Sequence, residues 1–377
     1  MTNPIGIYLH IPFCRQRCDF CAFYLEVHRE PAAQAFLAAL KTEIALQAEQ
    51  EGIRGRAFQS VYFGGGTPTT LKPAQLIEIL TEIRKHLTLT PECEVTVEAH
   101  PATVTQADLS MLHEAGVNRI SFGAESMQDE ELLRIGRPAL ARDTMTAVQA
   151  ARKAGFRNIN LDVMYGLPNQ TVESWAATLS QCLELASAHL SCYALTVEEG
   201  TRLAHDIRLQ RAQAPDESMQ VAMDRQAQRM LAEAGYLRYE LSNYAKPGWA
   251  CRHNLLYWTD GDYLGLGPSA HSFIQGSRFG NVANLTAYEA ALSQQTVPTE
   301  NCLALTKRER LRDAVIFGLR LMQGIPTDQL QDHAANYGRT QVVERLREHR
   351  LIEEEGTQSR LSAQGRLHAD TVAEKLF

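Results

Sequence analysis

Three cysteines near the start of the sequence are spaced for metal chemistry. Cys14, Cys18 and Cys21 follow the pattern C-x3-C-x2-C within eight residues. Thiolates are the usual protein ligands of iron–sulfur clusters. Three thiolates on a 4Fe–4S cluster leave one iron open, and that iron can chelate the amino and carboxylate groups of S-adenosylmethionine. An electron passed from the cluster to the sulfonium would then break a C–S bond and form an adenosyl radical.

A structural zinc site is the alternative use of the same thiols. Zinc in structural sites takes four ligands, and His10 or His28 could supply the fourth. Disulfides are disfavoured in a long chain without a secretion signal, because the cytosol keeps thiols reduced. We interpret most of the other cysteines as buried apolar residues; they are Cys93, Cys182, Cys192, Cys251 and Cys302.

The elements that must position these cysteines alternate between strand and helix over about the first 240 residues. Short β-rich runs lie at 6–10, 60–63, 94–99, 119–123, 158–164 and 190–195. Helices are expected between them at 32–50, 73–86, 106–114, 143–153 and 172–186. Six strand–helix repeats imply a parallel sheet with right-handed crossovers. Because the count falls short of eight, we expect an α/β fold built as a partial (β/α)6 barrel.

Residues of chemical interest follow the expected strands. The carboxyl ends of parallel strands form one face of such a sheet, and ligands bind there. Five separate strand ends should therefore converge on one site. The residues in question are the three cysteines, Gly64–Pro68, Glu98, Glu125 and Asp162.

The pattern changes after residue 195. A helix is expected at 215–234, and a segment rich in glycine, histidine and aromatic residues follows at 244–272. Further helices at 307–322, 326–336 and 340–348 precede a hairpin with arms at 351–354 and 359–362. We therefore divide the chain into a barrel (1–240), a connecting segment (241–300) and a small C-terminal winged-helix-like domain (301–377).

Composition limits the partners and the location. The formal net charge is -7 and the basic residues are dispersed, which gives no reason to expect nucleic acid. Met1 to Pro12 lack a basic start and reach the cysteines before an apolar core can form, so we expect no targeting segment. Without a run of about 18 apolar residues, stable membrane insertion is not expected either. Cytoplasm is the expected compartment.

Three sequence features together resemble the radical S-adenosylmethionine superfamily. They are the cysteine motif, the run Gly64-Gly-Gly-Thr-Pro68, and the segment DVMYGLPNQ from Asp162 to Gln170. More narrowly, the chain resembles oxygen-independent coproporphyrinogen oxidase and the haem chaperone HemW over nearly its whole length. The resemblance implies that the three cysteines bind a 4Fe–4S cluster beside S-adenosylmethionine.

The resemblance also implies roles for residues around the cofactor. Tyr8 and Phe20 would pack near it, Glu98 and Arg137 would supply charge, and Asp162 would lie on the ribose side. A lone aspartate after a strand can instead cap a helix. The loop that meets the methionine end would be Gly65, Gly66 and Thr67, where backbone must approach closely; a plain tight turn is the alternative.

Two positions depart from the resemblance. Glu125 stands where the relatives usually have glutamine. Glutamate keeps an acceptor for a ribose hydroxyl, but it loses the amide donor and adds a charge. His100 likewise replaces the more usual asparagine. We therefore expect an altered affinity for the cofactor.

Two features separate the oxidase from the chaperone. The oxidase normally has a fourth cysteine where this chain has Phe23, and it carries an N-terminal extension, whereas 13 residues precede Cys14 here. The segment from Cys251 to Trp258 matches the His-Asn-x-x-Tyr-Trp signature of HemW. Within it, His253 or Cys251 could ligate haem iron, while Tyr257 and Trp258 could cover the porphyrin. The alternative is a packed cap over the barrel.

The sequence therefore predicts a haem chaperone that binds a 4Fe–4S cluster, S-adenosylmethionine and haem. It would deliver haem to acceptor proteins, respiratory ones in particular, and would need an electron donor for the cluster. Two enzyme classes are alternatives that share the same core: oxygen-independent coproporphyrinogen III oxidase, and a radical enzyme that degrades or methylates haem.

Overall fold

A single mixed sheet of twelve strands forms the centre of the computed structural model, which describes residues 4–377. Six neighbouring strands pair in parallel, as the strand–helix repeats predict. In sheet order they are β1 (Ile5–Ile11), β4 (Ala57–Gly65), β5 (Thr88–Ala99), β6 (Arg119–Glu125), β7 (Asn158–Tyr165) and β8 (His189–Ala194). Residues 1–3, the first of the predicted barrel range, lie outside the described residues.

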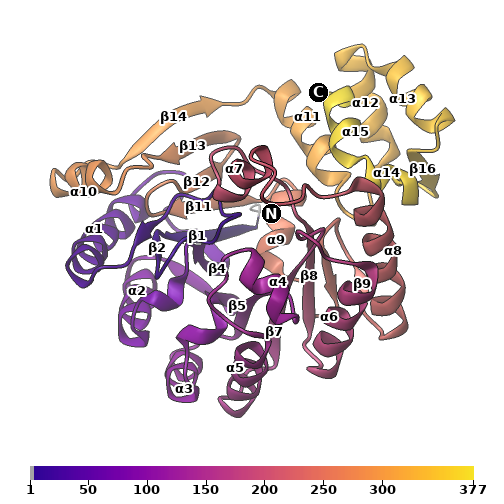
Figure 1. The fold of residues 1–377 in the computed structure, drawn as a ribbon. Coiled ribbons are helices and arrows are strands. Elements are labelled where there is room, and N and C mark those ends of the chain that lie inside the picture. The colour runs from indigo at the N-terminus through magenta and orange to yellow at the C-terminus, as the bar shows by residue number, and fades with distance from the viewer. Residues whose placement is uncertain (1–3) are drawn as a thin grey trace.

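Five helices cover the outer face of these strands (Figure 1). They are α1 (Glu30–Ala48), α2 (Pro73–His86), α3 (Gln106–Glu114), α5 (Ala141–Lys153) and α6 (Val172–Glu184). Local sequence sets several of their ends: Thr105 and Thr171 each form a capping box, and Gly116 and Gly155 follow α3 and α5 with positive φ. The predicted α/β partial barrel is confirmed.

Side chains alternate along each parallel strand between the helices and the barrel interior. In β1, Ile7 and Leu9 are fully buried in the core shared with the helices. Tyr8 and His10, which alternate with them along the strand, contact each other on the opposite face. The same alternation puts apolar residues under the helices and polar residues inside the barrel in β4 to β8. The interior can therefore be polar without weakening the apolar core.

The sheet continues beyond the parallel strands at both edges. Past β1 come β11 (Asp262–Leu266), which is parallel to it, and then the antiparallel strands β12 (His271–Ile274), β13 (Ser277–Asn281) and β14 (Thr299–Ala304). Past β8 come β10 (Asn243–Ala245) and β9 (Leu237–Arg238). The expectation of a parallel sheet thus needs correction to a mixed one. The segment 241–300, expected as a connection, supplies most of the added strands.

Shorter elements complete the barrel. The two-stranded pair β2 (Phe13–Cys14) and β3 (Glu26–Val27) carries the cysteine loop. α9 (Arg252–Trp258) packs against β1, β4 and β11. The others are η1 (Pro68–Thr70), η2 (Pro101–Thr103), α4 (Asp129–Arg134), α7 (Arg202–Arg208), α8 (Glu217–Glu233) and α10 (Leu285–Ser293).

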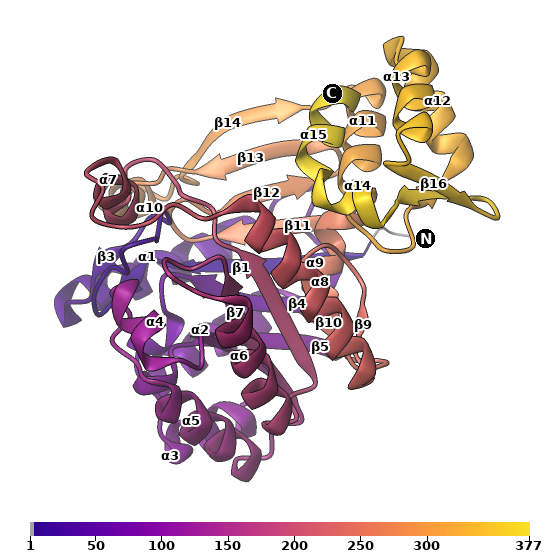
Figure 2. The ribbon, with the colours of Figure 1, turned by 45° about the vertical axis from the view of Figure 1, so that its right-hand side comes forward.

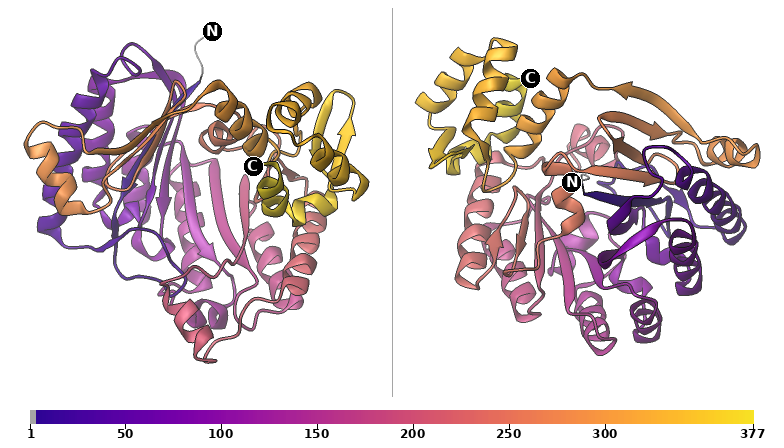
Figure 3. Two further views of the ribbon diagram at one scale, coloured as in Figure 1. Left: turned by 90° about the horizontal axis from the view of Figure 1, so that it is seen from above. Right: turned by 180° about the vertical axis from the view of Figure 1, so that it is seen from behind.

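The C-terminal domain has its own apolar core. It contains α11 (Lys307–Gly318), β15 (Ile325–Pro326), α12 (Thr327–Tyr337), α13 (Thr340–Glu348), β16 (Ile352–Glu355), β17 (Gln358–Leu361), α14 (Ala363–Leu367) and α15 (Ala369–Leu376). The three predicted helices and the hairpin are present; α14 and α15 were not expected. Figure 2 shows β12, β13 and β14 running toward this domain, and Figure 3 shows it apart from the outer helices α2, α3 and α5. Across residues 4–377, no helix combines the length and apolarity needed to cross a bilayer.

Candidate functional site

The cysteine loop begins where β1 ends. Cys14 is buried in β2, and its Sγ lies 3.2 Å from Thr67 Oγ1. Cys18 Sγ accepts a hydrogen bond from Arg137 Nη1 at 3.7 Å. Burial raises the pKa of the Cys14 and Cys18 thiols, and the neighbouring cysteines raise it further, whereas Arg137 lowers it. A hydroxyl and a guanidinium therefore stand ready to stabilise thiolates in this loop.

The glycine loop after β4 is built around the cysteine loop. The Gly66 amide donates to Ile11 O at 2.8 Å, and the Thr67 amide donates to Phe13 O at 2.7 Å. A Cβ on Gly66 would lie 2.6 Å from Phe13 O, and Gly65 adopts a φ of 103°. These glycines are therefore required because one backbone segment lies directly against another. The loop fixes the segment that carries Cys14, so it is more than a plain turn.

Partly buried charged groups lie at the carboxyl ends of β5 and β6 and within β7. Glu98 accepts a hydrogen bond from Tyr62 OH at 2.7 Å, and burial raises the pKa of Glu98 to about 7. Burial also raises the pKa of Glu125 to about 7, although Arg137 lies 3.4 Å away and opposes this. Arg137 thus links Glu125 to Cys18.

Asp162 lies inside β7, so it is not a helix cap. Ser121 Oγ donates to its carboxylate at 2.8 Å, and Asn160 Nδ2 donates to it at 2.9 Å. These contacts hold the carboxylate on the inner face of the sheet. The structure thereby brings Glu98, Glu125, Arg137 and Asp162 to the same end of the barrel as the cysteines.

Two aromatic residues predicted near the cofactor lie in different surroundings. The Tyr8 ring stacks on Tyr62 inside the barrel, with ring centroids 6.2 Å apart. Phe20 packs against a small apolar cluster that includes Ile135 and Leu167. Tyr8 therefore lines the interior, whereas Phe20 anchors the cysteine loop to the strands beyond β6.

The zinc alternative finds little support in His10, whereas His28 Nε2 is buried without a hydrogen-bond partner in residues 4–377. His10 Nε2 lies 3.0 Å from Tyr24 O, and its Nδ1 lies 3.5 Å from Tyr8 OH, so both ring nitrogens are engaged. Within residues 4–377, no three His, Cys, Asp or Glu side chains lie close enough together to hold one metal ion. A 4Fe–4S cluster does not need such convergence, since each thiolate binds a different iron. The donor set fits a cluster better than a single zinc ion.

The haem-ligand residues predicted on α9 lie in the core. His253 is 1% exposed; its Nδ1 lies 2.9 Å from Ser60 Oγ, and its Nε2 lies 2.9 Å from Tyr257 OH. Burial lowers the pKa of His253 to about 3. Cys251 is fully buried and its thiol faces Glu94, with its pKa raised to about 12. Both side chains are enclosed by protein in this structure, and haem ligation by His253 or Cys251 stays a prediction.

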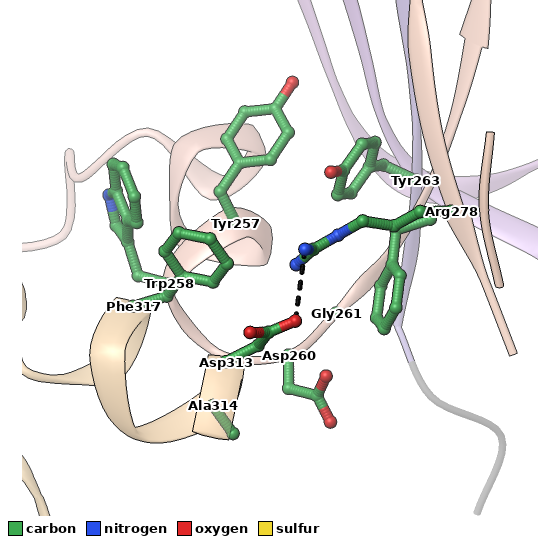
Figure 4. Close-up of a pocket in the computed structure, with 10 residues that line it drawn as sticks. Tyr257, Trp258, Asp260, Gly261, Tyr263, Arg278, Asp313, Ala314 and Phe317 are labelled. Atoms are coloured by element: carbon green, nitrogen blue, oxygen red, sulfur yellow. Dashed lines mark ion pairs between the residues drawn. The ribbon is translucent and has the colours of Figure 1, made fainter. Parts of the chain in front are cut away.

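Tyr257 and Trp258 behave differently from the rest of that segment. Both line a cavity of about 270 Å³ at the C-terminal domain (Figure 4). The structure therefore divides the signature: its histidine faces the barrel interior, and its two aromatic rings border a cavity.

Sequence reasoning missed several interior residues. The Tyr62 ring stacks on His253 at 5.1 Å and its hydroxyl reaches Glu98, so it connects α9 with the cofactor end of the barrel. Arg119 is 1% exposed, and two of its guanidinium nitrogens have no hydrogen-bond partner in residues 4–377. Strict alternation within β4 and β6 was the signal that could have placed both on the inner face.

Comparisons with known proteins agree with this geometry. A family profile described as the Radical SAM superfamily matches residues 8–182, and one described as the HemN C-terminal domain matches residues 305–368. The chain is 32% identical to "Heme chaperone HemW" of Mycobacterium tuberculosis over 378 residues, which covers 100% of this chain and 95% of that protein. It is 32% identical to the Bacillus subtilis protein of that name, with 97% of each chain covered.

A solved structure shows the same fold. Coproporphyrinogen III oxidase (HemN) from Escherichia coli aligns with a TM-score of 0.86 at 25% identity, covering 99% of this chain and 90% of that one. The partial barrel with three thiols and a glycine loop at its carboxyl end defines a radical S-adenosylmethionine protein, a class that uses a 4Fe–4S cluster and S-adenosylmethionine. Within this class, the chain belongs to the HemW family.

Proposed function

We propose that this protein binds haem and delivers it intact to acceptor proteins. The observation that carries the proposal is the full-length similarity to relatives named as haem chaperones, at 32% identity over 95% and 97% of their lengths. The match to the oxidase structure covers 99% of this chain and 90% of that one, but its sequence identity is lower, at 25%. A shared fold does not separate these functions.

The cluster site follows from the thiol contacts. We assign Cys14, Cys18 and Cys21 as ligands of the 4Fe–4S cluster, which when bound supplies an electron to the sulfonium of S-adenosylmethionine. Thr67 and Arg137 touch two of these thiols and would stabilise them as thiolates. Gly65, Gly66 and Thr67 would meet the methionine end of the cofactor, and Glu98, Glu125 and Asp162 would surround the remainder.

One residue of the cysteine loop favours the chaperone over the oxidase. Phe23 stands where the oxidase has its fourth cysteine, and its side chain is 68% exposed. A thiol is thus missing from this position, and an exposed apolar ring takes its place.

We further propose respiratory haem proteins as acceptors, a separate electron donor for the cluster, and the cytoplasm as the location. The reducing compartment is supported by the eight cysteines, none of which forms a disulfide within residues 4–377. The electron donor is required because the cluster must be reduced before it can act. The choice of respiratory acceptors rests on the family resemblance alone.

Anaerobic reconstitution followed by haem titration tests the proposal. Haem should bind to a saturable stoichiometry, and mass analysis afterwards should recover haem unchanged. Consumption of coproporphyrinogen by the reduced protein would establish the oxidase instead, and an altered tetrapyrrole would establish a haem-modifying enzyme.

A second measurement tests the cluster ligands. Cys18→Ala should lose the cluster iron, measured by iron content and absorption. Cys302→Ala, at an exposed position remote from the loop in sequence, should keep it. Full iron content in Cys18→Ala would refute the assignment.

A further inference from the structure

A layer of polar side chains crosses the barrel interior next to Asp162. Ser121 of β6, Asn160 of β7 and His189 of β8 are register partners across three neighbouring strands. Each of them is 1% exposed or less. Asp162 is two residues further along β7 than Asn160 and therefore lies on the same face, one step closer to the carboxyl ends of the strands. The layer thus lies between Asp162 and the closed end of the barrel.

The carboxylate of Asp162 determines which way the amide of Asn160 points. An ionised carboxylate only accepts hydrogen bonds. Asn160 presents its Nδ2 to Asp162 Oδ1 at 2.9 Å and to Ser121 Oγ at 2.7 Å. Ser121 Oγ in turn donates to Asp162 Oδ2 at 2.8 Å. The amide oxygen of Asn160 therefore faces away from Asp162, on the side of His189.

The proton positions on His189 follow from its two neighbours. Its Nδ1 lies 2.6 Å from Asn160 Oδ1, and because an amide oxygen only accepts, Nδ1 carries a proton. Burial and the positive charge of Arg119 hold the pKa of His189 well below its ordinary value. The ring is therefore neutral and its Nε2 accepts a hydrogen bond from Tyr239 OH at 2.9 Å. The bonds from Tyr239 to Asp162 thus all run in one direction.

This chain of donors holds the Asp162 carboxylate in one orientation and leaves it free to bind a ligand. The two donors use two of the roughly four lone-pair sites of a carboxylate. Asp162 is only partly buried, so a ligand can reach the remaining sites. A ligand-binding group acts best when the residues behind it fix its orientation.

We propose that Asn160 and His189 are positioning residues for S-adenosylmethionine, which hold Asp162 so that its remaining lone pairs accept hydrogen bonds from the ribose hydroxyls. This inference rests on the proposed placement of Asp162 beside the cofactor and extends it to residues that do not touch the cofactor. The competing explanation is that the layer only stabilises the barrel, because every buried polar group needs a partner. The two explanations predict different results for a ligand without ribose hydroxyls.

Anaerobic titration of the full-length, cluster-reconstituted protein with S-adenosylmethionine tests the proposal. Asn160→Leu removes a donor to the Asp162 carboxylate and should weaken binding about tenfold or more. His189→Leu lets the Asn160 amide rotate and should weaken binding about threefold or more. His189→Asn places an amide donor near the former Nδ1 and should restore most of the affinity. An analogue of S-adenosylmethionine that lacks both ribose hydroxyls should bind wild type and His189→Leu equally.

A smaller substitution keeps the test decisive if the leucine variants fail to fold. Ser121→Ala deletes a single oxygen, and it should weaken S-adenosylmethionine binding about tenfold because Asp162 Oδ2 loses its donor. Ser272→Ala is the matched control. Ser272 is likewise buried in the same sheet, but it lies in β12 and accepts from the Gly265 amide, so its loss should leave the affinity unchanged.

Asp162→Asn separates this inference from the placement on which it rests. We expect this variant to bind S-adenosylmethionine more weakly than wild type. Wild-type affinity in Asp162→Asn would show that Asp162 does not contact the cofactor and would overturn the inference with it. If Asp162→Asn weakens binding and Ser121→Ala, Asn160→Leu and His189→Leu do not, only the positioning role is overturned. Equal weakening for the analogue without ribose hydroxyls, or no recovery in His189→Asn, would show that the layer is merely structural.

Discussion

Glu125 and Arg137 place opposite charges directly beside the cysteine loop. Their side chains lie 3.4 Å apart, and Arg137 also donates to Cys18 Sγ. Glu125 has a φ of 62°, a left-handed conformation that costs a non-glycine residue energy, so the surrounding structure must hold it there. The glutamate found in place of the more usual glutamine thus adds a negative charge close to a site that binds an electron-accepting cluster.

Above pH 7, where the Glu125 carboxyl with its pKa of about 7 is ionised, Glu125→Gln should raise the reduction potential of the cluster. Removing a negative charge from the surroundings stabilises the reduced, more negative form, because net charge is one determinant of cluster potential. A redox titration followed by electron paramagnetic resonance measures this. Glu130→Gln, on the exposed side of α4 with its carboxylate 84% exposed, is the control and should leave the potential unchanged. A lower potential in Glu125→Gln would contradict the assigned position of this charge.

Much of the site could be predicted from residue types and spacing. The cysteines and the glycine loop follow strand ends, Glu98 and Asp162 lie within β5 and β7, and the order of parallel strands brings them together. The position of His253 could not be predicted in this way. A histidine beside aromatic residues is compatible with a ligand or with a packed core, and contacts with Ser60 and Tyr62, from a distant part of the sequence, decide between them.

At the scale of elements, α9 lies against β1 because β1 has a glycine at the contact. A Cβ on Gly6 would come within 2.4 Å of Ser60 Oγ, 2.5 Å of Leu256 Cδ1 and 2.9 Å of His253 Nδ1. The absence of a side chain at residue 6 therefore lets the helix reach the start of the parallel strands.

Gly6→Ala should displace α9 and cost about 1–3 kcal/mol of unfolding free energy, as overpacking does. Urea unfolding measures this loss. Leu256→Ala opens space at the same contact, so the double variant should be less destabilised than the sum of the two single variants. Additive losses of unfolding free energy would show that α9 does not pack against Gly6.

Glu43 joins α1 to the added strands. Its buried carboxylate accepts hydrogen bonds from the Gly267 amide, the Asn281 side chain and the Tyr288 hydroxyl. Burial raises the pKa of Glu43 from 4.5 to about 7, despite these donors. Folding therefore favours the protonated form of this carboxyl group.

Stability should depend on pH through Glu43. The contribution of Glu43 to the free energy of unfolding is fully present below pH 4.5 and is lost as pH rises through about 7. A pKa shift of this size corresponds to about 3 kcal/mol. Glu43→Gln should remove the share of the pH dependence that Glu43 supplies, leaving that of Glu98 and Glu125, and Glu49→Gln, at an exposed position, should retain the wild-type dependence. Urea unfolding across pH 4 to 8 provides the test, and identical pH profiles for wild type and Glu43→Gln would contradict it.

The sequence predicted the repeating elements better than the added strands. Long amphipathic patterns marked the helices, and α2 and α3 have the predicted bounds. β11, β12 and β13 are only four or five residues long, and Gly265 and Gly280 interrupt their patterns. The pairing of β11 with β1, through which β12 and β13 join the sheet, links residues more than 200 positions apart in the chain, which no local pattern reveals.

At the scale of the whole molecule, two apolar cores meet at the aromatic cavity. The barrel and the C-terminal domain each have a core of their own. Trp258 of α9 and Phe317 of α11 approach each other there, with ring centroids 6.4 Å apart. Haem binding should therefore require both parts, whereas S-adenosylmethionine binding should require the barrel alone.

Leu330→Ala should separate these two requirements. Leu330 is fully buried in the core of the C-terminal domain, so its truncation should destabilise that domain by about 2–5 kcal/mol. We expect weaker haem binding and unchanged S-adenosylmethionine binding, measured by titration of each ligand. Leu109→Ala, on α3 and fully buried in the barrel core, is the matched control and should impair S-adenosylmethionine binding instead. An equal loss of affinity for both ligands in Leu330→Ala would show that the barrel and the C-terminal domain act as one unit.

Transfer of haem tests the central claim most directly. Protein loaded with one equivalent of haem is mixed under anaerobic conditions with an apo-form respiratory haem protein, in the presence of an excess scavenger of free haem. We predict that the acceptor becomes loaded faster than it does from free haem under the same conditions, and that mass analysis finds the haem intact. Haem that passes to the scavenger, or that is recovered chemically altered, would contradict a chaperone function.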